Sequence, residues 1–206
     1  MIKTINTLFV TMLGLGKVPK IPGTFGSLAT VIILYLFFHI LNLSSNLILI
    51  LLIIIFVLSF SAVAHHIKDN ENKDPKEVII DEFIGQSIPI YLYEISHGTE
   101  KSPNEALIFY SICFVLFRFF DIAKPFPVNF FDKKFKNSFG VIMDDVIAGI
   151  YVVLSLICFM VLSSYLAALR SRFRAFFTVA FCIEDLFLLL NKNLFISILA
   201  PFLTPI

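Results

Sequence analysis

Two long apolar runs constrain this chain more than any other feature, because neither contains a charge. Leu47–Ala64 provides 18 uncharged residues and Val146–Ala168 provides 23, and a helix needs about 20 to cross a bilayer. The mean hydropathy of +0.92 and the charged fraction of 15% are also far from those of a soluble domain. The runs lack the alternation of a membrane barrel, so we expect an all-α integral membrane protein.

Shorter apolar stretches complete the expected bundle. Leu28–Leu41 precedes Leu47–Ala64 across a polar break, and together they predict one helical hairpin. Phe83–Tyr93 and Ala106–Phe120 predict a second hairpin, whose first arm is re-entrant or short because Pro89 interrupts it. The expected fold is a polytopic membrane bundle of about four to six helices.

Composition and charge also bear on the domain plan and the partners. We predict one membrane domain over residues 1–166, followed by a tail over residues 167–206. An amphipathic surface helix, a further hairpin and a segment without function all remain open for the tail. The net charge of +1 gives no basic footprint for nucleic acid, so none is expected as a partner. The sequence leaves the oligomeric state open.

Charged residues are concentrated between two apolar runs, in residues 117–149. This segment holds four aspartates, four lysines, one arginine and two prolines. Ionisable groups at the edge of a hydrocarbon layer need a partner, water or a metal, so they are candidates for a functional site. Arg118 and Asp121 are three residues apart on one helical face, and Asp144 and Asp145 directly precede an apolar run.

A second acidic pair, Asp81 and Glu82, directly precedes the apolar stretch of the second hairpin. Gly85 lies one helical turn beyond Asp81, as Gly149 does beyond Asp145. Small residues let helix backbones approach closely in lipid, so the two acidic pairs could lie on neighbouring helix ends. Acidic side chains at a helix start could equally be structural, because they interact favourably with the helix dipole.

The segment Gly14–Ser27 is rich in glycine and proline, which predicts an irregular backbone. Thr24 or Ser27 could cap a helix that begins at Leu28, and the free N–H groups of a helix start favour an anion such as phosphate. A turn that merely starts a membrane helix is the alternative.

The two hairpins bring the glycine-rich segment and both acidic pairs to one face of the membrane. Excess Lys and Arg mark the cytoplasmic side, which predicts that this face is cytoplasmic. Its basic residues are Lys17, Lys20, Lys124, Lys133, Lys134 and Lys136.

Carboxylates without a matching set of histidines or cysteines favour a hard cation such as Mg²⁺. Arg118 and Lys124 nearby suit a phosphate-bearing lipid headgroup, because cations neutralise the charge on phosphoryl oxygens. Two alternatives remain: a small cation transporter that uses intramembrane carboxylates, and a non-catalytic bundle held by acid–base pairs. A carrier would place its acids near the middle of the membrane in discontinuous helices, so acids at helix ends favour phosphate chemistry.

Five motifs, taken in order, resemble the phosphatidylglycerophosphatase A family over roughly residues 10 to 165. The resemblance implies a magnesium-dependent phosphatase of the bacterial inner (cytoplasmic) membrane, with a phospholipid as its substrate. It would remove the terminal phosphate of phosphatidylglycerophosphate on the cytoplasmic side and give phosphatidylglycerol. The motifs are PGTFGS (Pro22–Ser27), DEFIG (Asp81–Gly85), FRFFDIAKPFP (Phe117–Pro127), FD (Phe131–Asp132) and GVIMDDVIAG (Gly140–Gly149).

The resemblance also implies a set of site residues. The expected ligands of Mg²⁺ are Asp81, Glu82, Asp121, Asp144 and Asp145. The expected catalytic residues are Asp81, Asp121, Asp132 and Asp145. The expected substrate-binding residues are Gly23, Thr24, Gly26, Ser27, Arg118 and Lys124. Asn137, Ser138 and Phe139 stand where the family commonly has glycines.

Overall fold

A computed structural model describes residues 2–68, 75–97, 103–135 and 137–199. For residues 2, 97, 132, 133 and 172–199 only the backbone is described. Helices account for every regular element in these ranges, which confirms the all-α prediction. In chain order they are α1 (Ile2–Val10), the 3₁₀ turn η1 (Leu15–Lys17), α2 (Pro22–Tyr35), the π-helical η2 (Leu36–Ile40), α3 (Ser45–Ile67), α4 (Ile80–His97), α5 (Pro103–Ala123), α6 (Val128–Lys134) and α7 (Ser138–Leu199).

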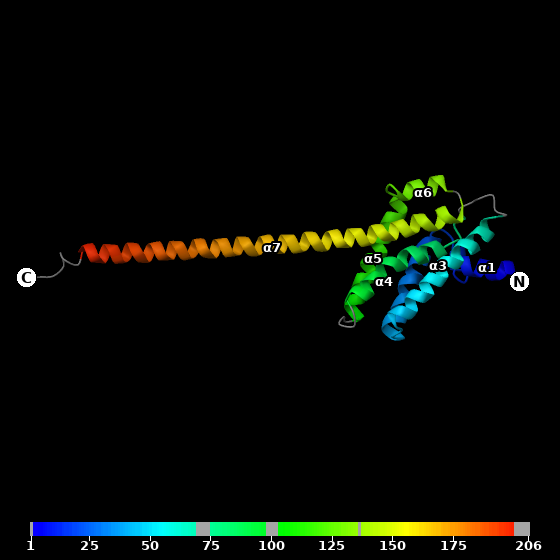
Figure 1. Cartoon of the computed structure of the whole chain (residues 1–206), viewed down its shortest axis with the longest axis horizontal. Coiled ribbons are helices and arrows are strands. Elements are labelled where there is room, and N and C mark those ends of the chain that lie inside the picture. The colour runs from blue at the N-terminus through cyan, green and yellow to red at the C-terminus, as the bar shows by residue number, and fades with distance from the viewer. Residues whose placement is uncertain (1, 69–74, 98–102, 136, 200–206) are drawn as a thin grey trace, which may run out of the picture. The chain divides into compact units, whose positions relative to one another are not determined.

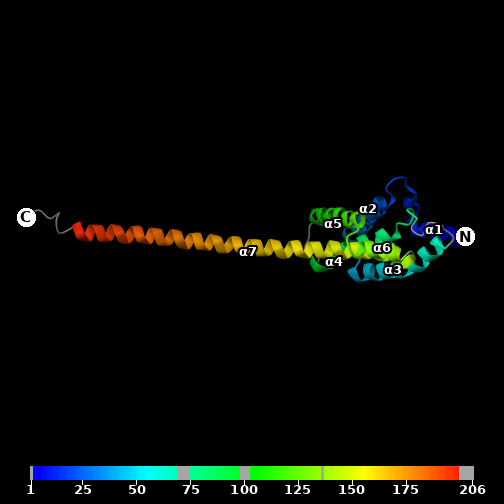
Figure 2. The same ribbon diagram turned by 90° about the horizontal axis from the view of Figure 1, so that it is seen from above.

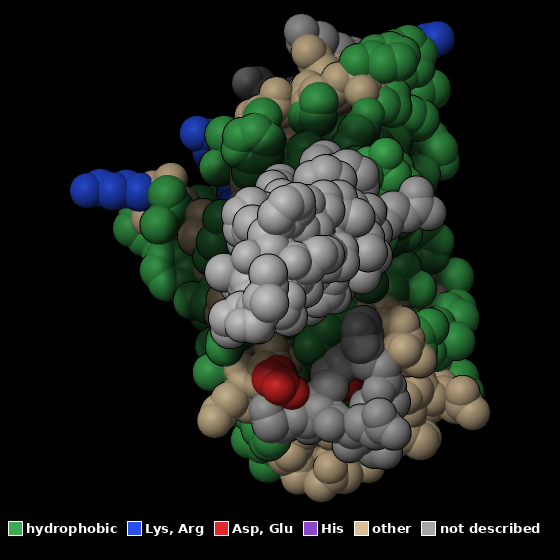
Figure 3. Space-filling model, turned by 90° about the vertical axis from the view of Figure 1, so that its left-hand side faces the viewer, with side chains coloured by type: hydrophobic (Ala, Val, Ile, Leu, Met, Phe, Trp, Pro, Cys, Tyr) green, Lys and Arg blue, Asp and Glu red, His purple; other side chains and the backbone are tan. Residues whose placement is uncertain are grey.

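Four helices in the described part are long and apolar enough to cross a membrane. They are Pro22–Ile40, Ser45–Ile67, Pro103–Ala123 and Ser138–Ser171. Only 17% to 33% of their apolar windows is buried within the chain, so most of these side chains face outward. Hydrophobic side chains accordingly cover much of the face in Figure 3. Outward-facing apolar surface on this scale suits lipid, and the chain is a polytopic membrane protein.

The helix α4 lies at the centre of the bundle and is not among these four spans. It packs against α2, α3 and α5 (Figure 1), and its Phe83, Ile84 and Ile90 are buried. Pro89 lies inside α4 without ending it, as happens where neighbouring helices cover the backbone. Figure 2 shows α2 and α5 on one side of the first turns of α7 and α3 on the other. The short second hairpin of the prediction is therefore α4 with α5.

The start of α2 differs from the prediction. The helix begins at Pro22, six residues before Leu28, and neither Thr24 nor Ser27 caps it. Proline suits the first helical position because its missing N–H has no partner there in any case. Glycine is needed inside this helix because neighbouring elements lie close to it: a Cβ at Gly26 would lie 3.0 Å from the Ile79 side chain.

The start of α7 also comes earlier than the apolar pattern predicts. Asn137 accepts a hydrogen bond from the Gly140 N–H at 3.0 Å, so its side chain caps a helix that begins at Ser138. Asp144 and Asp145 therefore lie on the second turn of α7 and do not precede it. The side-chain cap from Asn137 fixes the start of α7 at Ser138.

Contacts within the chain define two units, residues 1–156 and residues 157–206. The first unit contains α1 to α6 and the first turns of α7, and all site residues discussed below belong to it. In the second unit, the backbone continues as helix to Leu199. The functional division after residue 166 stays a prediction.

Candidate functional site

Two glycines bring α4 and α7 into backbone contact. A Cβ at Gly85 would collide with the carbonyl of Asp145 and would lie 2.7 Å from the Phe117 ring, and a Cβ at Gly149 would collide with the carbonyl of Gly85. The close approach expected from the sequence is thus confirmed. It places the second turn of α7 against the first turn of α4, and so brings the two acidic pairs together.

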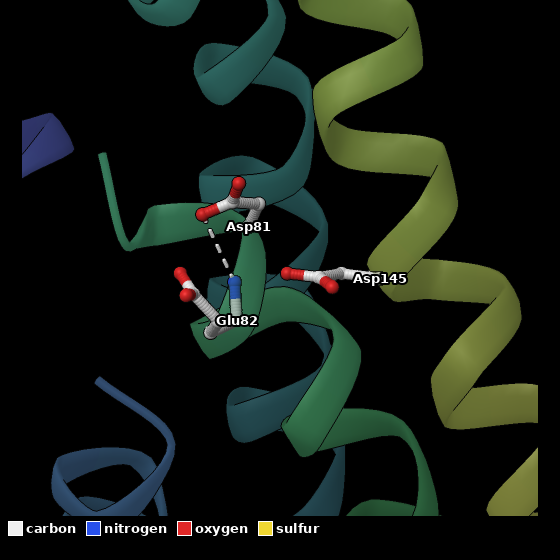
Figure 4. A group of neighbouring side chains, drawn as sticks. All are labelled: Asp81, Glu82 and Asp145. Atoms are coloured by element: carbon white, nitrogen blue, oxygen red, sulfur yellow. Dashed lines mark hydrogen bonds between the residues drawn. The ribbon is translucent and has the colours of Figure 1, made fainter. Parts of the chain in front are cut away.

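Three carboxylates meet at this contact, those of Asp81, Glu82 and Asp145. Each offers one oxygen, and these oxygens lie within 4.8 Å of one another. In Figure 4, the side chain of Asp145 extends from α7 toward the two acids of α4, and Asp81 accepts the Glu82 N–H at 3.1 Å. Asp81 and Asp145 are buried. Carboxylates this close together are neutralised either by protons or by a bound cation.

The surroundings of Glu82 fit a hard divalent cation. Its Oε2 atom is buried and has no hydrogen-bond partner among the described residues. Burial, followed by the charge of Asp145, raises the pKa of Glu82 from 4.5 to about 8. A buried acceptor left without a donor costs free energy that a bound ion would recover. Oxygen ligands suit a hard cation such as Mg²⁺, which usually keeps several waters and binds one or two carboxylates, so the three acids offer enough ligands for one ion.

The remaining two acids of the predicted metal site are paired with basic residues. Arg118 Nη1 lies 2.7 Å from Asp121, and Lys124 Nζ lies 2.9 Å from Asp144. Asp121 also interacts electrostatically with Glu82 and Asp145, so it lies beside the cluster. The structure brings all five acids together, and their roles as ligands stay predictions.

A cavity of about 370 Å³ opens over these residues. It is bounded by the segment before α2, the segment before α4, the end of α5 and the start of α7. Besides the five acids, its lining includes Lys20, Ile21, Pro22, Gly23, Thr24, Lys76, Val78, Arg118, Ile122, Lys124 and Val141. The predicted convergence of three distant motifs is therefore confirmed.

The first turn of α2 contributes backbone to this cavity. A Cβ at Gly23 would collide with the Glu82 carboxylate and would lie 3.2 Å from Arg118 Nη1, so glycine lets the helix start reach the site. Ile21 provides no side-chain cap, which leaves N–H groups of the first turn available to an anion. Gly23 and Thr24 thus lie where the prediction places phosphate contacts.

Two predicted residues lie elsewhere, and the prediction for a third, Asp132, is not tested. Gly26 packs against Ile79 and does not line the cavity. Ser27 is buried, and its Oγ accepts a hydrogen bond from Arg118 Nη1 at 3.3 Å, so it orients Arg118. Asp132 belongs to α6, but its side chain lies outside the described residues.

The sequence motifs miss two basic residues of the cavity, Lys20 and Lys76. Lys20 entered the prediction only as part of the basic face, and Lys76 lies in the hydrophilic segment before the second acidic pair. Lys20 lies two residues before the motif Pro22–Ser27 and Lys76 five residues before the motif Asp81–Gly85, and this closeness is the signal that could have identified them.

Residues 8–162 match the family model described as phosphatidylglycerophosphatase A. The chain belongs to the phosphatidylglycerophosphatase A family. It is 34% identical over 155 residues to the protein of that name from Haemophilus influenzae, covering 74% of this chain and 88% of the relative. The phosphatidylglycerophosphatase A of Escherichia coli is 31% identical over 137 residues, or 66% of this chain and 73% of that one.

A Bacteroides thetaiotaomicron relative, whose name proposes a phosphatidylinositol-3-phosphatase, is 34% identical over 146 residues. These cover 70% of this chain and 86% of that protein. No solved structure matches the chain significantly. Membership of the family favours a lipid phosphatase over the cation transporter and the non-catalytic bundle.

Proposed function

We propose that the chain is a magnesium-dependent phosphatase that hydrolyses phosphatidylglycerophosphate to phosphatidylglycerol and inorganic phosphate. One observation carries the proposal. Carboxylates from α4 and α7 lie in the same cavity as Arg118, Lys124 and the uncapped first turn of α2. Acids that hold a cation and basic groups that hold a phosphate are thereby combined in one site, as phosphoryl transfer requires.

In the proposed site, Asp81, Glu82 and Asp145 would hold the ion. When bound, Mg²⁺ supplies positive charge that offsets the charge of the phosphoryl oxygens. Arg118 is oriented for a phosphate oxygen by Ser27 and Asp121, and N–H groups of the first turn of α2 offer further donors.

Hydrolysis joins a water oxygen to phosphorus and breaks the bond between phosphorus and the glycerol oxygen. The glycerol oxygen gains a proton, and both products leave as stable species. Basic groups that bind the phosphoryl oxygens speed this reaction by stabilising the charge that builds up in the transition state. Arg118 and Lys124 are placed to do so, because both line the cavity beside the acids.

We also propose that the cavity faces the cytoplasm of a bacterial inner membrane. Lys17, Lys20, Lys76 and Lys124 belong to the segments around the cavity, and an excess of lysine marks the cytoplasmic side. The relatives of the same name are bacterial proteins, which supports this location.

Phosphate release from phosphatidylglycerophosphate by the purified full-length chain tests the proposal. We expect release that depends on Mg²⁺, stops with a chelator and falls at least about 100-fold in Asp145→Asn. Glu105→Gln is the matched control, because Glu105 is an exposed acid in the first turn of α5 that does not line the cavity. Full activity of Asp145→Asn would refute the site, and absence of phosphate release by the wild type would refute the function.

The Bacteroides relative gives a second candidate substrate, phosphatidylinositol 3-phosphate. This lipid also carries a phosphomonoester on a headgroup that is joined by a phosphodiester. Measuring kcat/KM for both lipids under the same conditions decides between them, and we expect the larger value for phosphatidylglycerophosphate.

A further inference from the structure

Four basic side chains line the cavity, but only two of them are paired with its acids. Arg118 and Lys124 each form an ion pair with an aspartate. Lys20 and Lys76 line the same cavity, are exposed to solvent and make no ion pair among the described residues. The cavity therefore offers two cationic groups beyond those that its own acids neutralise.

The loop that carries Lys20 and the loop that carries Lys76 are held together by backbone contacts. The Ile79 N–H, before α4, donates a hydrogen bond to the Val10 carbonyl at 3.0 Å. A side chain at Gly16, in η1, would collide with the backbone of Glu77. Backbone contact over this stretch holds the segment before α2 against the segment before α4. The two lysines thus belong to one basic rim of the cavity.

The acid closest to this rim in sequence has another partner. Glu77 follows Lys76 directly, but its Oε1 lies 2.9 Å from His66 Nε2 in α3. The side chain of His66 is largely buried, at 10% exposure, so the pair is held in place by packing. Among the described residues no acid takes up Lys76, which is left available to an anion from outside the chain.

Two features of Lys20 indicate that it binds a ligand. Its φ of 83° lies in the left-handed region, which is costly for a lysine and recurs at ligand sites. Ile21, the next residue, lines the same cavity and is 53% exposed. The phosphodiester of a phospholipid lies between its polar head and its acyl chains. A site for it needs a cation beside apolar surface, as Lys20 and Ile21 provide.

We propose that Lys20 and Lys76 bind the phosphodiester of a lipid headgroup that carries two phosphates. The inner part of the cavity then takes the terminal phosphomonoester. This inference rests on the proposed phosphatase function and deepens it, because it names the residues that select the substrate. A lipid with a single phosphomonoester, such as phosphatidate, fills the inner site and leaves the rim without an anion.

The test compares the full-length wild type with the double variant Lys20→Gln/Lys76→Gln in detergent–lipid micelles. Lys17→Gln is the matched control, because Lys17 is exposed and close to Lys20 in sequence but does not line the cavity. KM and kcat are measured for phosphatidylglycerophosphate and for phosphatidate with the same acyl chains. We expect the double variant to raise the KM for phosphatidylglycerophosphate by about 10-fold to 100-fold, and to change phosphatidate hydrolysis by less than about twofold.

Phosphatidylglycerol gives a second measurement that needs no turnover, because it keeps the diester and lacks the monoester. In micelles of a non-ionic detergent that contains no phosphate, its affinity should fall about 10-fold in the double variant and stay unchanged in Lys17→Gln. Equal losses on both phosphate substrates, or no loss on either, would overturn the assignment of the rim. If the wild type releases phosphate from neither lipid, the phosphatase function fails, and phosphatidylglycerol binding then decides the role of the lysines by itself.

Discussion

Binding of Mg²⁺ should depend on pH in a way that the environment of Glu82 determines. Glu82 lies in the first turn of α4, outside the four candidate spans, and its burial raises its pKa to about 8. Below that pH the metal-free site holds a protonated, neutral Glu82. Because Mg²⁺ binds the ionised carboxylate, each ion that binds must displace this proton. The affinity for Mg²⁺ is therefore expected to rise with pH up to about 8 and then to level off.

The size of the change in Mg²⁺ affinity follows from the difference between the pH and the pKa of Glu82. At pH 6 only about 1% of Glu82 is ionised, so the Kd for Mg²⁺ should be about 100-fold weaker than at pH 9. At pH 7 each ion that binds should release protons, close to one of them from Glu82. Isothermal titration calorimetry of the full chain, in two buffers of different ionisation enthalpy, measures both the Kd and the proton count. Without substrate present, the titration of the lipid phosphate does not contribute.

Two variants separate Glu82 from other acids. Glu82→Gln keeps an oxygen ligand but has no proton to lose, so it should bind Mg²⁺ more weakly and show a smaller pH dependence. Glu105→Gln, on the surface, should behave as the wild type does. A wild-type Kd that is equal at pH 6 and pH 9 would refute the reasoning, since Glu82 would then be ionised throughout.

Three further predictions concern the frame of the site. Gly149→Ala should lower kcat/KM by about 100-fold, because its new methyl group pushes α7 away from Gly85 and misaligns the acids; unchanged kinetics would contradict this. Lys124→Gln removes the cation beside the buried carboxylate of Asp144 and should lower the free energy of unfolding by about 2 kcal/mol. Thermal unfolding in detergent measures this loss, and adding Asp144→Asn should recover part of it. Gln86 is fully buried, and its amide atoms have no hydrogen-bond partner among the described residues. Gln86→Leu should therefore raise the free energy of unfolding by about 1 kcal/mol. A lower melting temperature in this variant would argue for a bound water or ion beside Gln86.

The sequence predicts the helical hairpins and the convergence of the acidic motifs because both follow from local pattern. An uncharged run such as Leu47–Ala64 has few alternatives to a membrane helix, and it is observed as α3, with bounds of Ser45–Ile67. Once the number of membrane crossings is fixed, the acidic motifs must lie on the same side of the membrane. The spacing of Gly85 and Gly149 then indicates which helices touch.

Other parts of the site depend on contacts that a sequence pattern does not contain. The glycines of the first α2 turn look like helix breakers, yet Gly23 lies inside the helix, where the Glu82 carboxylate leaves no room for a side chain. The start of α7 depends on one side-chain cap from Asn137. Lys20 and Lys76 both line the cavity because backbone contacts hold their two loops against each other.

The contact between Gly85 and Gly149 also limits how this protein can admit a bulky lipid. Side chains at an interface can change rotamer and give way, but here carbonyl groups face glycines and leave nothing to rotate. Parting α4 from α7 would also pull Asp145 away from Asp81 and Glu82. Any widening of the cavity must then occur at its loop side, so that the acids stay in register while the headgroup arrives and the product departs.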